Sequence, residues 1–245
     1  MQENYLVKEN KQIAKDTYRL LLVGNTKKIK KPGQFVNIKI PGFYLRRPIS
    51  VSDWNEAELT LIYKILGEGT RKLAEVSVGT TLDVLSGLGN GFSLPKEKEK
   101  KVVLIGGGVG IPPLYGLAKF LLQNNYTPEV ILGCNTKEEL FLVEEFRALG
   151  LTVHLCTMDG SAGTKGVVTD VMRAQDLCDA YFYACGPMGM LKAIYALSTA
   201  AGEFSLEERM GCGFGACMGC SIETTKGAMR ICKEGPVFQK EVLLW

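Results

Sequence analysis

Four cysteines near the C-terminus constrain this chain more than any other feature. They are Cys212, Cys217, Cys220 and Cys232, in the segment GCGFGACMGCSIETTKGAMRIC, and the spacing is C-x4-C-x2-C followed by a longer gap. This spacing is one of those by which four thiolates bind a [2Fe–2S] cluster. Such a loop must turn several sulfurs toward one inorganic core, and Gly211, Gly213, Gly215 and Gly219 supply the backbone freedom. We therefore predict that the four cysteines are metal ligands.

Two other uses of these cysteines remain open at this point. A structural zinc site also takes four cysteines, but usually from two short knuckles, whereas here three crowd one loop and the fourth stands apart. A disulfide framework is typical of short secreted chains. This chain has 245 residues, and its charged start, MQENYLVKENK, lacks the apolar core of a signal peptide.

Composition narrows the class of protein. The net charge of +3, without an interleaved basic and aromatic patch, does not favour a nucleic-acid partner. No run of about 18 apolar residues predicts a membrane span. Eight cysteines without an export signal favour a cytoplasmic location. The only histidine, His154, lies in the apolar run LTVHLC and is expected to be structural, so we expect no catalytic acid or base.

The first 95 residues or so predict a small β-barrel or sandwich. Short apolar or alternating runs separated by turn signals occur at Thr17–Val23, Gln34–Ile40, Pro48–Ser52, Leu59–Ile65 and Thr81–Leu85. The charged segment Pro95–Lys101 then predicts a linker.

From Val102 the pattern predicts a parallel sheet wound with helices. Buried strands are expected at VVLI, Glu129–Gly133, Thr152–Cys156 and Tyr181–Ala184. One helix follows Pro112–Pro113, and another spans Pro187–Ala201. Thr136 and Glu139 predict a capping box before a helix that Gly150 ends.

Four short motifs could contact nucleotides, although each also has an ordinary structural interpretation. GGGVGIPP, Gly106–Pro113, joins a strand to a helix, where glycines let phosphates approach backbone amides. Cys185–Gly186–Pro187 ends a later strand at the same edge of the sheet. In the β half, Arg47–Ser50 could hold a phosphate or a flavin edge, and Gly67–Thr70 a pyrophosphate. If no ligand binds, the two motifs of the α/β half would be ordinary strand-to-helix turns, Arg47 would be a surface arginine, and Thr70 would be the N-cap of a helix.

The order of these motifs resembles that of the ferredoxin–NADP reductase superfamily over about residues 1–205. The cysteine segment extends the resemblance to the whole chain. Together with the runs RRPISVSD and ERMGCGFGACMGC, it makes the chain similar to the electron transfer subunits of bacterial NAD-linked dihydroorotate dehydrogenases. The resemblance implies a β-barrel FAD domain at 1–98, an α/β parallel-sheet NAD domain at 99–205 and a small iron–sulfur domain at 206–245.

The resemblance also implies site residues and cofactors, which are FAD, NAD and a [2Fe–2S] cluster. The residues that would contact FAD are Arg47, Pro48, Ile49 and Ser50. The flavin ring would be lined by Ile62, Tyr63 and Lys64, and the FAD pyrophosphate would be held by Gly69 and Thr70. Gly107, Gly108 and Gly110 would border the NAD site, with Cys185 near the nicotinamide, and Asp159–Gly163 would lie at the nucleotide edge. The segment CNTKEE after the second strand carries no arginine, which favours NAD over NADP.

The activity implied by the resemblance is that of an oxidoreductase subunit in pyrimidine biosynthesis. A catalytic partner subunit containing FMN would oxidise dihydroorotate, and electrons would pass through the cluster and FAD to NAD, in an assembly with two copies of each chain. Two alternatives remain open: the flavin subunit of a ferredoxin–NADP oxidoreductase or sulfhydrogenase complex, and a zinc-stabilised nucleotide-binding module without a redox role.

Overall fold

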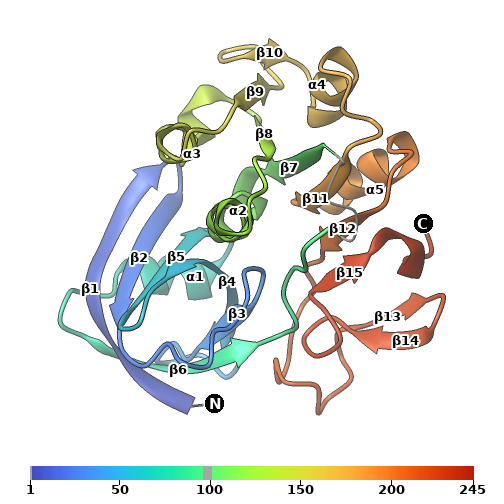
Figure 1. Cartoon of the computed structure of the whole chain (residues 1–245). Helices are drawn as coiled ribbons and strands as arrows, with labels where there is room; N and C mark the ends of the chain where they lie inside the picture. Colours follow the sequence, from blue (N-terminus) through green and yellow to red (C-terminus); the bar gives the residue numbers. More distant parts are fainter. Residues whose placement is uncertain (1, 96–100) are drawn as a thin grey trace.

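The computed structural model describes residues 2–95 and 101–245 of the chain. A β-barrel near the N-terminus, an α/β sheet and a C-terminal segment follow one another along the chain (Figure 1). Most of the expected linker Pro95–Lys101 lies outside the described residues. The fold class predicted from the sequence is confirmed.

The barrel is a closed antiparallel sheet of six strands in the order β1-β2-β5-β4-β3-β6. The strands are β1 (Gln2–Ala14), β2 (Thr17–Val23), β3 (Phe35–Ile38), β4 (Arg47–Trp54), β5 (Glu58–Lys64) and β6 (Thr81–Leu88), and α1 (Glu68–Ala74) follows β5. Alternate side chains such as Leu20, Leu61 and Val84 fill the interior and are fully buried. β1 is not among the strands expected from the sequence, because only Tyr5 and Val7 of its thirteen residues are buried and its apolar pattern is weak.

The second sheet has seven strands in the order β10-β9-β8-β7-β11-β12-β15. Its parallel strands are β7 (Val102–Gly107), β8 (Glu129–Cys134), β9 (Val153–Thr157), β10 (Thr164–Lys165), β11 (Tyr181–Cys185) and β12 (Gly202–Ser205). The edge strand β15 (Val237–Gln239) is antiparallel to β12. The C-terminal segment therefore completes the second sheet.

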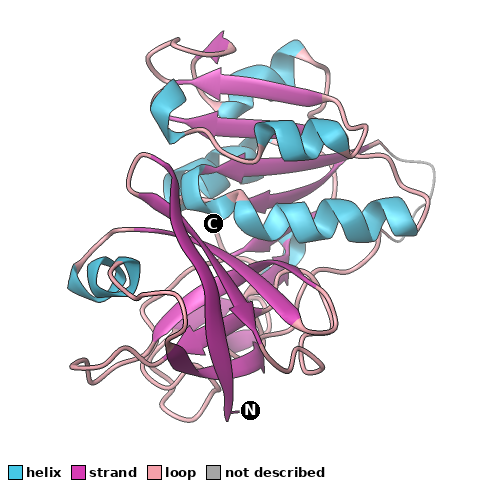
Figure 2. Cartoon of the chain, turned by 90° about the vertical axis from the view of Figure 1, so that its left-hand side faces the viewer, coloured by secondary structure: helices cyan, strands magenta, loops and turns pink. Residues whose placement is uncertain are grey.

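Helices cover both faces of this sheet, as the buried apolar runs of its strands require (Figures 1 and 2). One face packs against α2 (Pro112–Gln123) and α3 (Val143–Ala148), with Leu114, Leu117 and Phe146 in one buried cluster. The other face packs against α4 (Val168–Ala174) and α5 (Met188–Leu197), with Met172 and Ile194 in a second cluster. Figure 2 shows the barrel below these layers.

Three local expectations are wrong. Thr136 and Glu139 do not form a capping box: the segment Lys137–Glu139 is a single 3-10 turn, and α3 begins only at Val143. The carboxylate of Glu139 is used elsewhere, as described below. The helix expected over Pro187–Ala201 is shorter and ends at Leu197. Thr70 is not an N-cap, because α1 begins at Glu68; its hydroxyl accepts the N–H of Leu66 instead.

Candidate cofactor cavities and the cysteine segment

The first cavity, of about 190 Å³, opens on the barrel strands β4 and β5. Most of the residues that the family resemblance assigns to the flavin line it: Arg47, Pro48, Ile49, Ser50, Ile62, Tyr63, Lys64 and Thr70. They meet because β4 and β5 are neighbours in the barrel and α1 follows β5 directly. We refer to this space as the flavin cavity.

Gly69 does not line the flavin cavity but packs behind Arg47. A Cβ atom at Gly69 would lie 2.1 Å from Nε of Arg47, so a larger residue there would force the guanidinium to shift. Arg47 also stacks on Phe43, with Cζ 4.8 Å from the ring centroid, and none of the ion pairs among the described residues involves it. A guanidinium held in place without a carboxylate partner is suited to an anionic group such as a phosphate.

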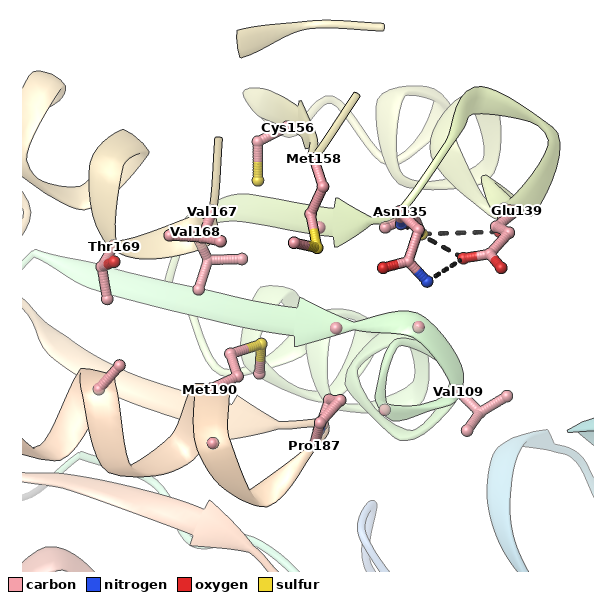
Figure 3. Close-up of a pocket in the computed structure, with 18 of the residues that line it drawn as sticks. Val109, Asn135, Glu139, Cys156, Met158, Val167, Val168, Thr169, Pro187 and Met190 are labelled. Carbon is pink, nitrogen blue, oxygen red and sulfur yellow. Dashed lines mark hydrogen bonds between the residues drawn. The ribbon is translucent and has the colours of Figure 1, made fainter. Parts of the chain in front are cut away.

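The second cavity, of about 550 Å³, lies at the carboxyl ends of β7, β8 and β11 (Figure 3). Gly107, Gly108 and Gly110 line it, as do Gly186 and Pro187 from the turn after β11. This edge of an open parallel sheet is where such folds bind nucleotides. We refer to it as the nucleotide cavity.

Cys185 lies beneath the nucleotide cavity rather than on its wall. Its side chain is buried, and burial raises the pKa of its thiol, so the sulfur is protonated at neutral pH. Gly110 packs directly on the carbonyl oxygen of Cys185. The backbone of Cys185 thus packs directly against the glycine turn.

The two cavities share part of their wall. Lys64, Leu66, Val109 and Glu207 line both. Glu207 is exposed to the cavities, yet the protein around it displaces enough water to raise the pKa of its carboxyl group. Ligands in the two cavities would therefore be neighbours, as hydride transfer between a nicotinamide and a flavin requires.

The cysteine segment combines a loop with a β-hairpin. Cys220 directly precedes β13 (Ser221–Thr224), and Cys232 follows β14 (Gly227–Arg230), so the antiparallel pairing of these strands brings the two cysteines together. The N–H of Cys232 donates to Sγ of Cys220 at 3.4 Å. Cys212 and Cys217 lie on the loop before the hairpin, where Gly213 and Gly215 have positive φ angles of 78° and 93°.

The sulfur chemistry of this segment fits an iron–sulfur cluster. Sγ of Cys212 accepts the N–H groups of Ala216 at 3.2 Å and Cys217 at 3.4 Å. Burial alone would raise the pKa of Cys212, but these hydrogen bonds outweigh it and lower the pKa to about 6. Backbone N–H groups directed at thiolate sulfur are one of the ways in which proteins stabilise such clusters.

All eight cysteines lie in the described parts of the chain and are free thiols there, which counts against the disulfide alternative. Within residues 2–95 and 101–245, no three His, Cys, Asp or Glu side chains are arranged to hold a single metal ion.

The cysteine segment packs against the barrel beside the flavin cavity. Nδ2 of Asn37 on β3 donates to the carbonyl of Cys212, and a Cβ atom at Gly213 would lie 2.5 Å from that nitrogen. Met210 and Pro236, on either side of the cysteines in sequence, line the flavin cavity itself. The cysteine segment, the flavin cavity and the nucleotide cavity are therefore consecutive neighbours.

Several lining residues were not found from the sequence. They are Asn135, Glu139, Met158 and Met190 in the nucleotide cavity, and Leu206, Glu207, Glu208 and Met210 in the flavin cavity. Asn135, Met158 and Leu206 directly follow parallel strands, and Met190 lies in the first turn of α5. These four positions lie at the carboxyl edge of the sheet. His154 lies on β9 and bonds Glu129 on the neighbouring strand at 2.7 Å, as expected for a structural histidine.

Two family descriptions match the chain. Residues 207–244 match the iron–sulfur cluster binding domain of dihydroorotate dehydrogenase B, and residues 104–195 match the oxidoreductase NAD-binding domain. A protein from Fusobacterium nucleatum subsp. nucleatum, the electron transfer subunit of dihydroorotate dehydrogenase B (NAD(+)), is 44% identical over 249 residues, covering 96% of each chain. The protein of the same name from Geobacillus sp. (strain WCH70) is 43% identical, with 99% of each chain covered.

The chain belongs to this family of electron transfer subunits. The match of residues 207–244 decides against the zinc alternative. The expected cofactor set of FAD, NAD and a [2Fe–2S] cluster is confirmed for the family, and the cavities and cysteines described above fit it. The name of the family implies a catalytic partner subunit. No helix in the described chain is long and apolar enough to cross a bilayer.

Solved structures share the fold. The structure of an NADH-dependent reduced ferredoxin-NADP oxidoreductase, described for flavin-based electron bifurcation, aligns with a TM-score of 0.88 and 32% identity. The alignment covers 98% of this electron transfer subunit and 90% of that chain. Phthalate dioxygenase reductase aligns with a TM-score of 0.68 and 18% identity over 84% and 69% of the two chains, which shows the common fold.

Proposed function

We propose that this electron transfer subunit accepts electrons from an FMN-containing catalytic subunit that oxidises dihydroorotate, and delivers them to NAD. The observation that carries the proposal is the spatial order of cysteine segment, flavin cavity and nucleotide cavity, in which each neighbour shares a wall or a contact with the next. Flavin chemistry connects one-electron carriers such as a [2Fe–2S] cluster to the two-electron hydride chemistry of NAD.

Each group of site residues would have its own role in this electron transfer. Cys212, Cys217, Cys220 and Cys232 would each ligate the cluster. Arg47 would hold an FAD phosphate. Gly107, Gly108 and Gly110 would let the dinucleotide approach the backbone. No side chain is needed as a base for the hydride step, which agrees with the single, structurally engaged histidine. The limits 1–98, 99–205 and 206–245 are our proposal for the three functional parts.

The partner would dock on the face around Cys217, which is the exposed member of the four cysteines. Phe214 and Met218 on the same loop are 44% and 51% exposed, and such apolar side chains are typical of protein interfaces. Docking there would place the partner's flavin next to the cluster on the side away from the flavin cavity. An assembly with two copies of each chain and a cytoplasmic location remain predictions.

The test is reconstitution. The isolated holoprotein should pass electrons from NADH to an artificial acceptor such as ferricyanide, because that needs only the flavin and nucleotide cavities. It should not reduce NAD with dihydroorotate, and adding the catalytic subunit should give that activity. Dihydroorotate-dependent NAD reduction by this chain alone would contradict the assignment, as would failure of the pair to couple.

A second candidate follows from the 32% identity and TM-score of 0.88 to the reduced ferredoxin-NADP oxidoreductase. In this alternative the same cofactors would serve a partner that exchanges electrons with ferredoxin. Coupling of NADH oxidation to ferredoxin, together with no response to dihydroorotate in the presence of the catalytic subunit, would favour it.

A further inference from the structure

An ion pair connects the barrel to the nucleotide-binding sheet where the two cavities meet. Nζ of Lys64, at the end of β5, lies 3.0 Å from Oε1 of Glu139, in the turn after β8. The side chains are only 25% and 15% exposed, and both line the nucleotide cavity. Burial tends to raise the pKa of Glu139, but Lys64 and the N–H groups of Asn135 outweigh it and lower the pKa. Glu139 is therefore a carboxylate at neutral pH.

The other oxygen of Glu139 holds Asn135. Oε2 accepts the backbone N–H of Asn135 at 3.2 Å and its side-chain Nδ2 at 3.0 Å (Figure 3). A carboxylate can only accept hydrogen bonds, so the amide nitrogen must face it. The amide oxygen, Oδ1, is then directed away from Glu139, and Figure 3 shows it pointing into the cavity on the side of Met158.

This arrangement gives the nucleotide cavity an acceptor of fixed orientation. Asn135 directly follows β8, at the carboxyl edge of the sheet, and its side chain is exposed to the cavity. Among the hydrogen bonds of the described residues, none is donated to Oδ1 of Asn135. An amide oxygen can accept from a hydroxyl group but not from a phosphate oxygen, which is itself an acceptor. Of the groups on a dinucleotide, the ribose hydroxyls and the amino groups of adenine and nicotinamide can donate to it. Asn135 directly follows the second parallel strand, β8, the position from which side chains reach the ribose in such folds, and this favours the ribose hydroxyls.

We infer that Glu139 is a positioning residue which, anchored by Lys64, directs Oδ1 of Asn135 at a ribose hydroxyl of the dinucleotide. The inference rests on the proposed function insofar as that function places NAD in this cavity. It explains why Glu139 is turned toward Asn135 and Lys64 rather than capping the turn at Thr136. It also gives Lys64 a role on the nucleotide side as well as on the flavin side.

The main test measures NAD+ binding to the oxidised holoprotein by isothermal titration calorimetry, and steady-state NADH oxidation with ferricyanide. Glu139→Gln keeps the size of the side chain but can offer an amide N–H₂ to Asn135, which lets the Asn135 amide reverse. We expect NAD+ to bind roughly 3- to 10-fold more weakly, the range of one hydrogen bond. KM for NADH should rise by a similar factor while kcat and FAD content stay unchanged. Glu144→Gln, at an exposed glutamate on α3, is the matched control and should leave NAD+ affinity unchanged.

A double-mutant cycle separates positioning from simple domain attachment. Asn135→Ala should weaken NAD+ binding by a similar factor, and adding Glu139→Gln to it should change little, because Glu139 acts through Asn135. Lys64→Arg should retain the affinity, whereas Lys64→Met should lower it. Unchanged affinity in Glu139→Gln would overturn the inference, and so would an undiminished effect of Glu139→Gln in the Asn135→Ala background.

A second measurement covers the case in which Glu139→Gln does not fold. NAD+ analogues that each lack one ribose hydroxyl are titrated into the wild-type protein and into Asn135→Ala. One analogue should bind the wild type more weakly than NAD+ but bind Asn135→Ala as well as NAD+ does. If every analogue loses the same affinity in both proteins, Asn135 does not bind a ribose hydroxyl. Coupling of wild-type protein to dihydroorotate is measured separately, so failure of the proposed function would be distinguished from failure of this inference.

Discussion

Gly110 packs so closely on Cys185 that a Cβ atom on it would lie 2.2 Å from the carbonyl oxygen of Cys185. The contact joins the glycine turn after β7 to the turn after β11. β7 and β11 are neighbouring strands, and between them the direction in which the chain adds strands to the sheet reverses. The obstacle is backbone rather than a flexible side chain, so it cannot move aside without shifting one of the two turns.

Gly110→Ala should therefore damage the nucleotide cavity and spare the flavin cavity. A displacement of about 1 Å in a positioning element can cost on the order of 10²-fold in rate. We expect a loss of this size in NADH oxidation with ferricyanide, with normal FAD content and normal iron and sulfide. Wild-type activity in this variant would show that the turn does not border the nucleotide.

Arg47→Ala should weaken FAD binding. It removes a charge-assisted hydrogen bond to an anionic group, which is worth roughly 1.5–3 kcal/mol, or about 10- to 150-fold in the dissociation constant. FAD release on dilution, followed by flavin fluorescence, measures the effect. Arg173→Ala, at an exposed arginine on α4, is the matched control. Equal FAD retention in Arg47→Ala and the control would remove Arg47 from the site.

Cys217→Ser should remove the cluster and leave the flavin in place, because the flavin cavity is built mainly on the barrel. Iron, acid-labile sulfide and the visible spectrum measure the loss. NADH oxidation with ferricyanide should survive, whereas dihydroorotate-dependent NAD reduction with the catalytic subunit should stop. Cys178→Ser, outside the cysteine segment, should behave as wild type. Zinc without sulfide in the wild-type protein would contradict the ligand assignment.

Glu203 should make stability fall as pH rises. This carboxyl group on β12 is 3% exposed, and burial raises its pKa, although the backbone N–H and hydroxyl of Ser93 bond to it and oppose the shift. Between the ordinary pKa of the unfolded chain and the raised folded value, the folded state binds a proton that the unfolded state has released. The free energy of unfolding therefore decreases with increasing pH through that window.

The measurement compares urea unfolding of wild type and Glu203→Gln at pH 5 and pH 8. The neutral glutamine removes this titration, so the variant should lose less stability than wild type between the two pH values. Glu144→Gln, at an exposed position, should follow wild type. An equal or larger loss in Glu203→Gln would contradict the role of burial.

The sequence by itself determined the chemistry and the order of the parts. The cysteine spacing indicated an iron–sulfur segment, because it is one of those by which four thiolates bind a [2Fe–2S] cluster. Alternating runs such as Thr17–Val23 predicted the barrel strands, and the change to buried apolar runs at Val102 predicted the parallel sheet. These features are local, since side-chain periodicity and turn residues act within a few positions of the chain.

Only the tertiary structure shows which residues of these parts contact one another. The sequence predicted that Glu139 forms a capping box with Thr136, but it pairs with Lys64, 75 residues earlier in the chain. β15 comes from the C-terminal segment yet completes the sheet beside β12. Met210 and Pro236 line a cavity that otherwise belongs mainly to the barrel. Such contacts depend on how separate elements pack. Ion pairs and buried cavity walls are stabilised only when segments distant in sequence come together and exclude water, so no local sequence pattern predicts them.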